Sequence, residues 1–375
     1  MILGTTQAAI GAVILFLAIV IVVVFLFVNA RQSRPEVGSE VELAPNRKPY
    51  YSDEELEGKK LDRVLTIGLL GMFICALGVP LYWLAEPGRQ AGAVKNFNAT
   101  FAKAGANLFA TTAKGGFNCA FCHGEKGVGN PGVDYVITDA DGRFQKQVSW
   151  KGPALNTVLL RFSRDEVRYI LTYGRPFSPM PAWGVKGGGA MDDQQLQNLI
   201  DYLQSIQITP KQAQAEAKDG LKKEKAAAEK AGKPYATDGE ALFNLGYYSG
   251  FAGGAYSCGR CHTQGWSFND KQADGNGAYG PALRNGGTLA QFPGDVVGLK
   301  QQLTFVCTGS EQGKLYGVHG QGTGRMPGFC ITPEEKADPT NGEVGVEKKT
   351  PGTPDQGAMY TQDQVRAIVE YERSL

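Results

Sequence analysis

Two stretches decide the fold of this chain, Cys119-Ala120-Phe121-Cys122-His123 and Cys258-Gly259-Arg260-Cys261-His262. Each places two thiols three positions apart, with an imidazole directly after the second thiol. Together they use four of the 7 cysteines and two of the 3 histidines in 375 residues. The two stretches are too far apart in the sequence for a zinc ribbon, whose cysteine pairs lie within about 15–20 residues of each other. One shared zinc site is therefore disfavoured.

The C-x-x-C-H spacing is typical of covalent attachment of c-type haem. The two thiols bond to the vinyl groups of the porphyrin, and the adjacent histidine reaches the iron as an axial ligand. A redox-active dithiol and a chance match are the alternative interpretations, but two copies that use most of the histidines favour haem. The sequence therefore predicts two haem c groups, attached at Cys119, Cys122, Cys258 and Cys261, with the iron ligands His123 and His262.

The sequence around the two motifs is also repeated. Four features recur in the same order: 105–109 with 239–243, Gly-Pro-Ala-Leu at 152–155 with the same tetrapeptide at 280–283, Met180-Pro181 with Met326-Pro327, and a capped amphipathic helix after Asp192 with one after Thr361. We call 96–207 the first repeat and 237–375 the second repeat.

Each repeat resembles a class I cytochrome c, which has an N-terminal helix, C-x-x-C-H, a Gly-Pro-x-Leu turn, a helix, a distal methionine and a packing C-terminal helix. The resemblance implies a mainly α fold with two tandem haem domains that carry loop and hairpin insertions. In that family the proline carbonyl of the turn accepts a hydrogen bond from the axial histidine, which fixes the imidazole tautomer. The resemblance assigns this role to Pro153 and Pro281.

Electron-transfer cytochromes close the sixth position of the iron, commonly with methionine. Met180 and Met326, each directly before a proline, are the candidates. Met191 is the rival in the first repeat, but it directly precedes a predicted helix cap, which favours a packing role. His319 is the rival in the second repeat, but its Gly-rich surroundings are typical of an exposed loop. We therefore predict Met180 and Met326 as iron ligands.

Two long apolar runs precede the repeats. Residues 8–28 and 64–84 carry no charge, and each is long enough to cross the roughly 30 Å hydrocarbon core of a bilayer. A signal peptide is the alternative for the first run, but residues 1–7 lack the lysine or arginine of its n-region. Lysine and arginine concentrate in 31–63, which predicts a cytoplasmic loop. The sequence thus predicts a two-helix hairpin, 1–30 and 64–84, in a lipid bilayer, with the N-terminus and both repeats outside the cytoplasm.

Four further features are predicted from weaker patterns. Alternating apolar residues around 139–142 predict a β-hairpin within 133–150. Cys307 and Cys330 are expected to form a disulfide that stiffens the insertion 310–320. Cys75, within the second apolar run, is expected to serve helix packing. The linker 208–236, rich in Ala, Lys and Glu, is expected to be a solvated helix, with a docking patch for an acidic partner as the alternative.

The charge balance excludes one class of function. The 38 basic and 37 acidic side chains give a net charge of +1, without a basic stripe, which disfavours a nucleic-acid binder. The 50 glycines suit small domains with tight turns, such as the two Gly-Pro-Ala-Leu segments.

An iron with both axial positions filled by the chain has no open site for a substrate, which favours one-electron transfer over an enzyme's chemistry. Tandem haem c domains on a membrane anchor resemble the dihaem cytochrome c subunits of actinobacterial quinol:cytochrome c reductases, which work with a haem–copper oxidase. The resemblance implies an electron-transfer subunit between those partners in a bacterial plasma membrane, although there the span follows the haem domains. The alternatives are an autonomous membrane-tethered carrier, a dihaem peroxidase and the cytochrome subunit of a periplasmic dehydrogenase.

Overall fold

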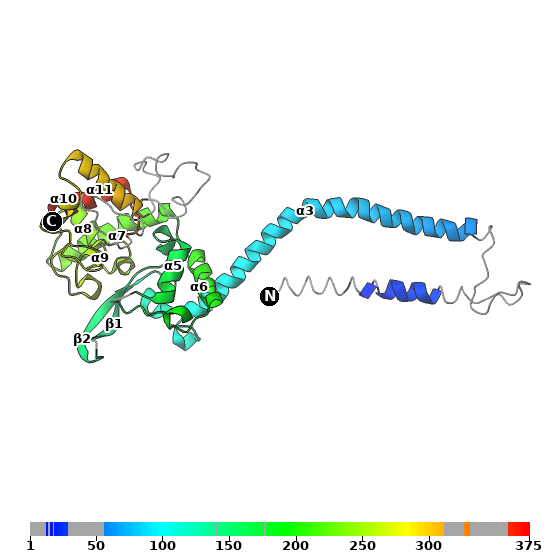
Figure 1. Cartoon of the computed structure of the whole chain (residues 1–375), viewed down its shortest axis with the longest axis horizontal. Helices are drawn as coiled ribbons and strands as arrows, with labels where there is room; N and C mark the ends of the chain where they lie inside the picture. The colour runs from blue at the N-terminus through cyan, green and yellow to red at the C-terminus, as the bar shows by residue number, and fades with distance from the viewer. Residues whose placement is uncertain are drawn as a thin grey trace, which may run out of the picture. The chain divides into compact units, whose positions relative to one another are not determined.

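The computed structural model describes residues 13, 16–17, 19–28, 56–139, 141–175, 178–310, 326–330 and 359–375. The chain divides into two compact units, Met1–Ala91 and Gly92–Leu375. Over the described residues the fold is mainly helical and contains one two-stranded sheet, in agreement with the predicted mainly α class (Figure 1).

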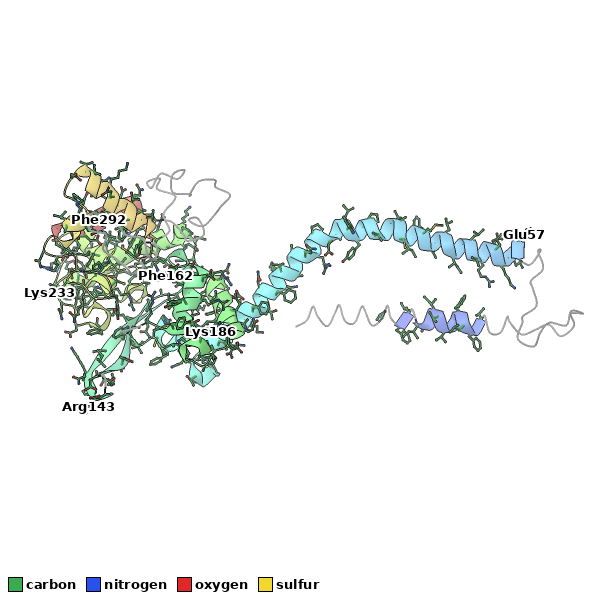
Figure 2. All side chains as sticks on the ribbon, in the orientation of Figure 1. Glu57, Arg143, Phe162, Lys186, Lys233 and Phe292 are labelled. Atoms are coloured by element: carbon green, nitrogen blue, oxygen red, sulfur yellow. A yellow bond between two sulfur atoms is a disulfide. The ribbon has the colours of Figure 1, made fainter. Side chains whose placement is uncertain are left out.

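The first unit contains the helical turn η1 (Leu56–Lys60) and most of the apolar part of α3 (Leu61–Phe109). By length and composition α3 is able to span a membrane, and no residue of its most apolar window is buried. Figure 2 shows the side chains of this part projecting away from the helix. The second predicted span therefore lies on a helix, which does not end at residue 84 but continues to Phe109 with Pro80 and Pro87 inside it. Cys75 is exposed on this helix.

The first predicted span is described only in part. Ile19–Val28 forms an apolar, exposed helix that is shorter than a membrane span. Much of 8–18 and all of 31–55 lie outside the described residues. The two-helix hairpin and its orientation stay predictions.

The first repeat holds its C-x-x-C-H motif on a short helix and ends with a longer one. After α3 its elements are η2 (Thr112–Lys114), α4 (Cys119–His123), β1 (Asn130–Thr138), β2 (Phe144–Gly152), η3 (Val158–Leu160), α5 (Arg164–Tyr173), η4 (Val185–Gly187) and α6 (Asp193–Ser205). Asp192 caps α6 as predicted: its side chain accepts from the Gln195 N–H, and the Gln195 side chain accepts from the Asp192 N–H.

Strands β1 and β2 form the predicted antiparallel hairpin, in which Val133 pairs with Trp150 and Tyr135 with Val148. Asp139 shapes the turn, because its Oδ1 accepts hydrogen bonds from the backbone N–H groups of Asp141 and Arg143. Figure 2 marks Arg143 at the tip of the hairpin. Val148 and Trp150 are buried, so the base of the hairpin is packed while its tip is exposed.

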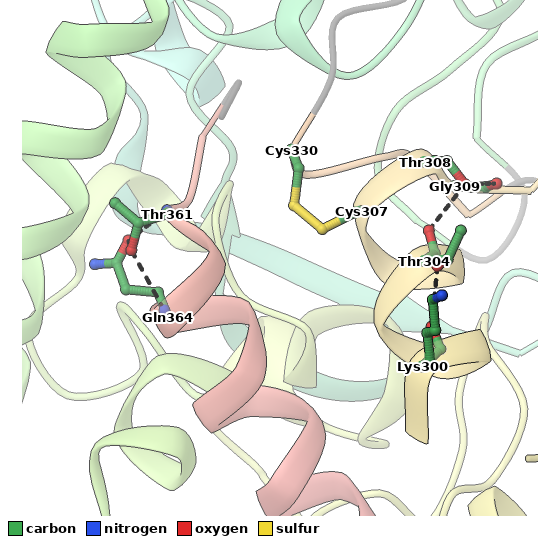
Figure 3. The surroundings of a disulfide bond; sticks show 8 residues. All are labelled: Lys300, Thr304, Cys307, Thr308, Gly309, Cys330, Thr361 and Gln364. Carbon is green, nitrogen blue, oxygen red and sulfur yellow. Dashed lines mark hydrogen bonds between the residues drawn. A yellow bond between two sulfur atoms is a disulfide. The ribbon is translucent and has the colours of Figure 1, made fainter. Parts of the chain in front are cut away.

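The second repeat follows the helix α7 (Pro210–Lys230). Its elements are α8 (Asp238–Phe243), η5 (Phe251–Gly254), α9 (Gly259–His262), η6 (Trp266–Phe268), α10 (Gly287–Gln291), α11 (Val296–Thr308) and α13 (Gln362–Ser374). Thr361 and Gln364 form the predicted capping box of α13 (Figure 3). Val365, Ile368 and Val369 are buried, as the amphipathic pattern predicts.

The N-terminal and C-terminal helices of each repeat cross at a glycine. A Cβ on Gly105 would lie 1.9 Å from the carbonyl oxygen of Asn198, and a Cβ on Gly239 would lie 2.1 Å from that of Ala367. An aromatic pair fills each crossing: Phe109 with Tyr202, ring centroids 5.1 Å apart, and Phe243 with Tyr371, 5.4 Å apart. The matched residues 105–109 and 239–243 thus make the same contact in both repeats.

Helix α7 is not solvated all round. Ala213, Ala217, Gly220, Glu224 and Ala228, spaced three or four residues apart, form a buried face. The carboxylate of Glu224 accepts hydrogen bonds from the backbone N–H groups of Gly246, Tyr248 and Ser249. It also accepts from the hydroxyl groups of Tyr235 and Ser249. The predicted helix is confirmed, but it packs on the second repeat because small residues on one face allow a close approach.

Cys307, near the end of α11, forms the expected disulfide with Cys330 (Figure 3). Both residues are buried, and their Cα atoms lie 4.5 Å apart. The insertion 310–320 lies outside the described residues except for Ser310. The disulfide therefore joins the two ends of segment 307–330, which contains Met326.

Candidate haem-binding site

Helix α4 carries Cys119, Cys122 and His123, the three candidate haem-binding residues of the first motif. It begins after Asn118, whose φ of 68° turns the chain sharply into the helix. Cys119 and Cys122 are free thiols in the structure, and burial raises the pKa of Cys119 to about 12 and raises that of Cys122. Redox-active C-x-x-C pairs have a lowered pKa instead. The raised pKa values disfavour the redox dithiol and suit thiols reserved for covalent attachment.

His123 is oriented by the backbone of the Gly-Pro-Ala-Leu turn. Its Nδ1–H donates to the carbonyl oxygen of Pro153 at 2.8 Å. Because a carbonyl only accepts, this bond fixes the proton on Nδ1 and leaves the Nε2 lone pair available for a metal. Burial lowers the pKa of His123, the bond to Pro153 raises it and the charge of Arg260 lowers it. The resulting neutral imidazole is the form that binds iron.

The glycine before each proline is required by its contact with the motif. A Cβ on Gly152 would lie 1.7 Å from the carbonyl oxygen of Cys122. A Cβ on Gly280 would lie 2.6 Å from Cε1 of His262. The two Gly-Pro-Ala-Leu segments therefore recur because the turn must pass directly against the motif it supports.

The second motif has the same local geometry. His262, on α9, donates its Nδ1–H to the carbonyl oxygen of Pro281 at 2.9 Å. Burial lowers the pKa of His262, which the Pro281 bond offsets in part. Cys258 is buried, which raises its pKa well above the ordinary value, whereas Cys261 is exposed. Each predicted histidine thus meets the proline that the resemblance assigned to it.

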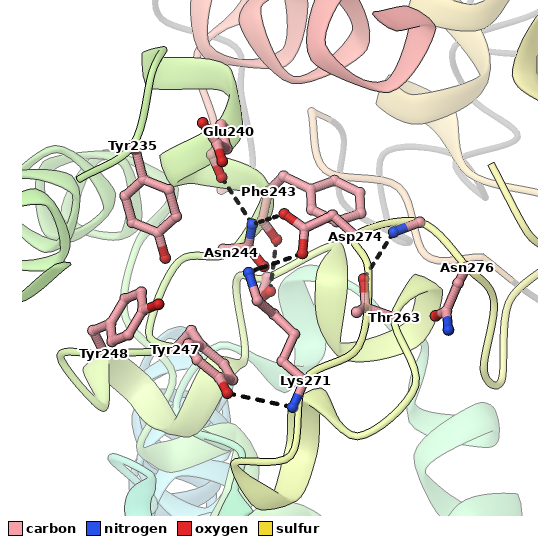
Figure 4. Close-up of polar contacts among 12 residues, drawn as sticks. Tyr235, Glu240, Phe243, Asn244, Tyr247, Tyr248, Thr263, Lys271, Asp274 and Asn276 are labelled. Atoms are coloured by element: carbon pink, nitrogen blue, oxygen red, sulfur yellow. Dashed lines mark hydrogen bonds and ion pairs between the residues drawn. The ribbon is translucent and has the colours of Figure 1, made fainter. Parts of the chain in front are cut away.

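A polar cluster supports the loop that follows His262 (Figure 4). The carboxylate of Asp274 accepts hydrogen bonds from Asn244 Nδ2 at 2.6 Å and from the Tyr371 hydroxyl at 2.8 Å, and it forms an ion pair with Lys271. Thr263, the residue after the histidine, accepts from the Gly275 N–H. Asn244 lies at the end of α8 and Tyr371 lies on α13. The cluster therefore ties the loop after the motif to both of these helices.

Each candidate methionine is held by a loop that returns to a helix-terminal glycine. Gly174 after α5 has a φ of 74°, and an added Cβ would lie 2.7 Å from the Met180 carbonyl oxygen. Gly309 after α11 has a φ of 69°, and its Cβ would lie 2.6 Å from the Met326 carbonyl oxygen. The next residue donates its N–H to the same carbonyl in both repeats, at 3.0 and 2.9 Å.

These two glycines were not singled out in the sequence. The signal that identifies them is a glycine directly after the helix that precedes each Met-Pro dipeptide. Met180 is partly buried against the core of the first repeat, and Met326 against that of the second. Met191 is fully buried in the core of the first repeat, which confirms its packing role. His319 lies outside the described residues.

Arg161, eight positions after Pro153, has an unusual side-chain environment. Its Nε is buried and has no hydrogen-bond partner among the described residues. Burial, with a smaller contribution from the charge of Arg260, lowers the pKa of Arg161 to about 10, so the side chain stays cationic at neutral pH. Leaving a buried cationic donor without an acceptor is costly, and an anionic group is the strongest acceptor for it. The propionate groups of haem are acceptors of this kind.

The residues present fit a haem c. The described part of the chain contains no group of three or more His, Cys, Asp or Glu side chains arranged to hold a bare metal ion. The first repeat instead offers two protonated thiols, one neutral imidazole with a free Nε2, a methionine on a braced loop and the buried Nε of Arg161, which has no hydrogen-bond partner among the described residues. Vinyl attachment, axial ligation and propionate binding need these groups.

Residues 101–203 match the family model described as cytochrome c oxidase, cbb3-type, subunit III. No curated protein and no solved structure matches the chain. The matched region contains the first motif, the Pro153 turn and Met180, and it ends within α6. The motif, the His123–Pro153 bond and the match together identify 101–203 as a c-type cytochrome domain that binds haem c covalently and is suited to electron transfer.

Proposed function

We propose that this chain is a membrane-anchored dihaem cytochrome c that passes single electrons from a quinol-oxidising complex to a haem–copper oxidase, as a subunit of a respiratory complex. The hairpin of two apolar runs would anchor it in a bacterial plasma membrane, with 31–63 in the cytoplasm and both repeats outside it. The chain acts as an electron-transfer subunit rather than as an enzyme by itself.

The observation that carries this proposal is the equivalence of the two motifs. His262 and Pro281 repeat the bond of His123 and Pro153, at 2.9 and 2.8 Å. The glycine before each proline lies against the motif in both repeats. This equivalence supports a second haem c, attached at Cys258 and Cys261.

Electron transfer without substrate chemistry is supported by the two methionine loops. When bound, haem iron supplies a one-electron couple, and a histidine–methionine ligand pair raises its potential. Pro153 and Pro281 orient the imidazoles, while the helix-terminal glycines Gly174 and Gly309 hold the methionine loops. With Met180 and Met326 as sixth ligands, neither iron has a position left for peroxide.

The choice of partners rests on similarity. The matched family is described as a subunit of a cytochrome c oxidase, which supports a haem–copper oxidase as the electron acceptor. The resemblance to dihaem subunits of quinol:cytochrome c reductases supports a quinol-oxidising complex as the donor. The apolar stretch of α3 supports membrane attachment.

The test is to extract the full chain from its native membrane in a mild detergent and to identify what co-purifies. We expect two haem c groups per chain by pyridine haemochrome assay, oxidase or reductase subunits in the preparation, and haem reduction by a quinol. The double variant Cys258→Ser with Cys261→Ser and the matched Cys119→Ser with Cys122→Ser should each remove one covalent haem. An intact complex whose haems a quinol does not reduce would contradict the proposal. Recovery of the chain alone would favour an autonomous carrier. High-spin haem together with turnover of peroxide would favour a peroxidase.

A further inference from the structure

The two repeats touch directly at the turn that orients His123. The Ala154 N–H donates to the carbonyl oxygen of Ala252 at 2.9 Å. A Cβ on Gly253 would lie 1.8 Å from the carbonyl oxygen of Gly152. The turn that accepts the His123 hydrogen bond is therefore packed, backbone to backbone, against η5 of the second repeat, only a few residues before Cys258.

Side chains close the rest of this contact. Trp150 at the base of β2 packs on Phe268 of η6, with ring centroids 5.4 Å apart. Lys151 Nζ donates to the Tyr247 carbonyl oxygen at 3.0 Å and to Asn269 Oδ1. Ala154 and Leu160 lie in the same hydrophobic cluster as the core of the second repeat. The relative position of the two motifs is thus fixed by buried apolar contacts as well as by hydrogen bonds.

Arg260 connects the two motifs through a single side chain. It stands between Cys258 and Cys261, inside the second motif. Its Nη1 donates to the carbonyl oxygens of Lys151 at 3.1 Å and of Gly253 at 2.9 Å. Lys151 lies two residues before Pro153, the acceptor for His123. Arg260 and His123 therefore bind carbonyl groups that lie two residues apart on the same stretch of backbone.

The charge of Arg260 is not neutralised by a carboxylate among the described residues. Its neighbours in electrostatic range include the guanidinium groups of Arg161 and Arg175, which belong to the first repeat. Both of those groups also lie beside the Phe162 ring, 5.5 and 5.4 Å from its centroid. Three guanidinium groups, one from the second motif and two from the first repeat, therefore gather at the junction between the two motifs.

We infer that Arg260 is a positioning residue that couples the two haem sites: it ties the proximal turn of the first site to the second motif and holds a positive charge between the two motifs. The inference rests on the proposed function, since it requires haem at both motifs. A fixed cation near an iron favours the reduced state, which carries one positive charge fewer, so it raises the reduction potential. Because Arg260 lies between both sites, its charge acts on both.

A purely structural role makes a different prediction. A residue that only stabilised the second motif would affect the second haem and leave the first unchanged. Arg284 is a matched control, because its Nη1 also donates to a backbone carbonyl, that of Asp274, but entirely within the second repeat.

The experiment is a potentiometric titration of the detergent-solubilised full-length holoprotein, followed in the haem α bands. Two one-electron waves are expected, and the wave that moves in a Met180→His variant belongs to the first haem. Arg260→Gln should shift the reduction equilibrium of both haems toward the oxidised state by up to tenfold, which is about 59 mV for a one-electron couple. Arg284→Gln should leave the first wave in place. A first wave that is unmoved in Arg260→Gln overturns the inference.

Arg260→Lys keeps the inference testable if the glutamine variant does not attach haem. This variant retains the charge, so both waves should stay within threefold of the wild-type equilibrium. A first wave that moves further than this although the charge is retained overturns the electrostatic coupling. Failure of the proposed function has a separate signature: a wild-type protein with one wave and one covalent haem lacks the second site.

Discussion

The two methionine loops share their backbone contacts but differ in how they are supported. In the first repeat Ser178 Oγ accepts from the Met180 N–H and donates to the Arg175 carbonyl, so the loop is closed locally. In the second, Ser310 Oγ accepts from the Met326 N–H at 2.7 Å, and the insertion between these residues is bracketed by the Cys307–Cys330 disulfide. The same backbone hydrogen bond to the methionine carbonyl is supported by a short turn in one repeat and by a covalent cross-link in the other.

The surroundings of the repeats differ in the same way. The first repeat extends a hairpin, β1–β2, onto the second. The second repeat receives α7 on its surface and fixes it through the buried Glu224. The comparison indicates that the local geometry of each C-x-x-C-H motif depends on glycine contacts common to both repeats, while stability depends on supports particular to each. Four substitutions or conditions test this division.

The largest effect is expected at the common glycines. In Gly152→Ala the new Cβ would lie 1.7 Å from a backbone oxygen, that of Cys122, which cannot move without moving the motif. We expect a loss of about 4 kcal/mol or more, at the upper end for single substitutions, and loss of the first haem. In Gly280→Ala the Cβ meets a side chain, the His262 ring at 2.6 Å, which yields more readily than a backbone oxygen, so we expect a smaller loss of stability. Covalent haem content and thermal unfolding of the two variants measure the difference; equal effects would contradict it.

The disulfide should matter only for the second repeat. Removing it by Cys307→Ala with Cys330→Ala opens a loop with a sequence separation of 23, which costs about 3 kcal/mol on the chain-entropy model. We expect earlier unfolding of the second repeat and a weaker Met326 ligand, seen as a change in the methionine–iron charge-transfer band of one haem. The first haem is the internal control. A change in both haems would show that the support is shared.

Glu224→Gln should weaken the docking of α7. The substitution replaces one acceptor oxygen by an NH₂ group that faces N–H donors, so we expect a loss of about 2 kcal/mol in unfolding free energy. Glu229→Ala, on the exposed face of the same helix, is the matched control and should change stability by less than about 0.5 kcal/mol. Denaturant unfolding of the holoprotein measures the stability of both variants. Equal losses in the two variants would contradict a stabilising role of the buried carboxylate.

The fourth effect is a pH dependence particular to the second repeat, which is absent at low pH. Burial raises the pKa of Glu372 on α13 to about 7, and the hydrogen bond from Gln302 offsets this in part. In the first repeat, Asp201 on α6 instead pairs with Arg164 at 2.5 Å. Because the folded pKa of Glu372 exceeds the unfolded value of 4.5, the folded state holds the proton more tightly. Stability is therefore lost as the pH rises from about 4.5 through about 7.

Glu372→Gln removes this titration. At pH 8 the variant should be more stable than the wild type by about 3 kcal/mol, and at pH 4 the two should be nearly equal. Thermal unfolding of the second repeat across this pH range is the measurement. A wild-type slope that persists in the variant would assign the pH dependence to another group.

The sequence was sufficient where the signal is local. The caps at Asp192 and Thr361 and the turn at Asp139 depend on residues a few positions apart, and the structure contains all three. The β-hairpin 133–150 and the Cys307–Cys330 pair were also predicted correctly. The His–Pro bonds followed from the family resemblance, since the prolines lie 30 and 19 positions after their histidines.

Contacts between distant segments could not be predicted in this way. Glu224 looks like one more charge in a Lys-rich helix, and only the loop 246–249 that donates to it explains its burial. Arg260 occupies a variable position of C-x-x-C-H, where the pattern specifies no residue. Its carbonyl acceptor on Lys151 lies 109 positions away. These residues act through tertiary packing, which a spacing rule does not contain.

The hairpin β1–β2 also gives the pair of repeats a fixed order. It is an insertion of the first repeat alone, yet Trp150 and Lys151 at its base bind surfaces found only on the second, Phe268, Tyr247 and Asn269. Two copies of the same repeat could not form this contact. The two repeats thereby make an asymmetric pair, in which each contributes a different surface to the contact.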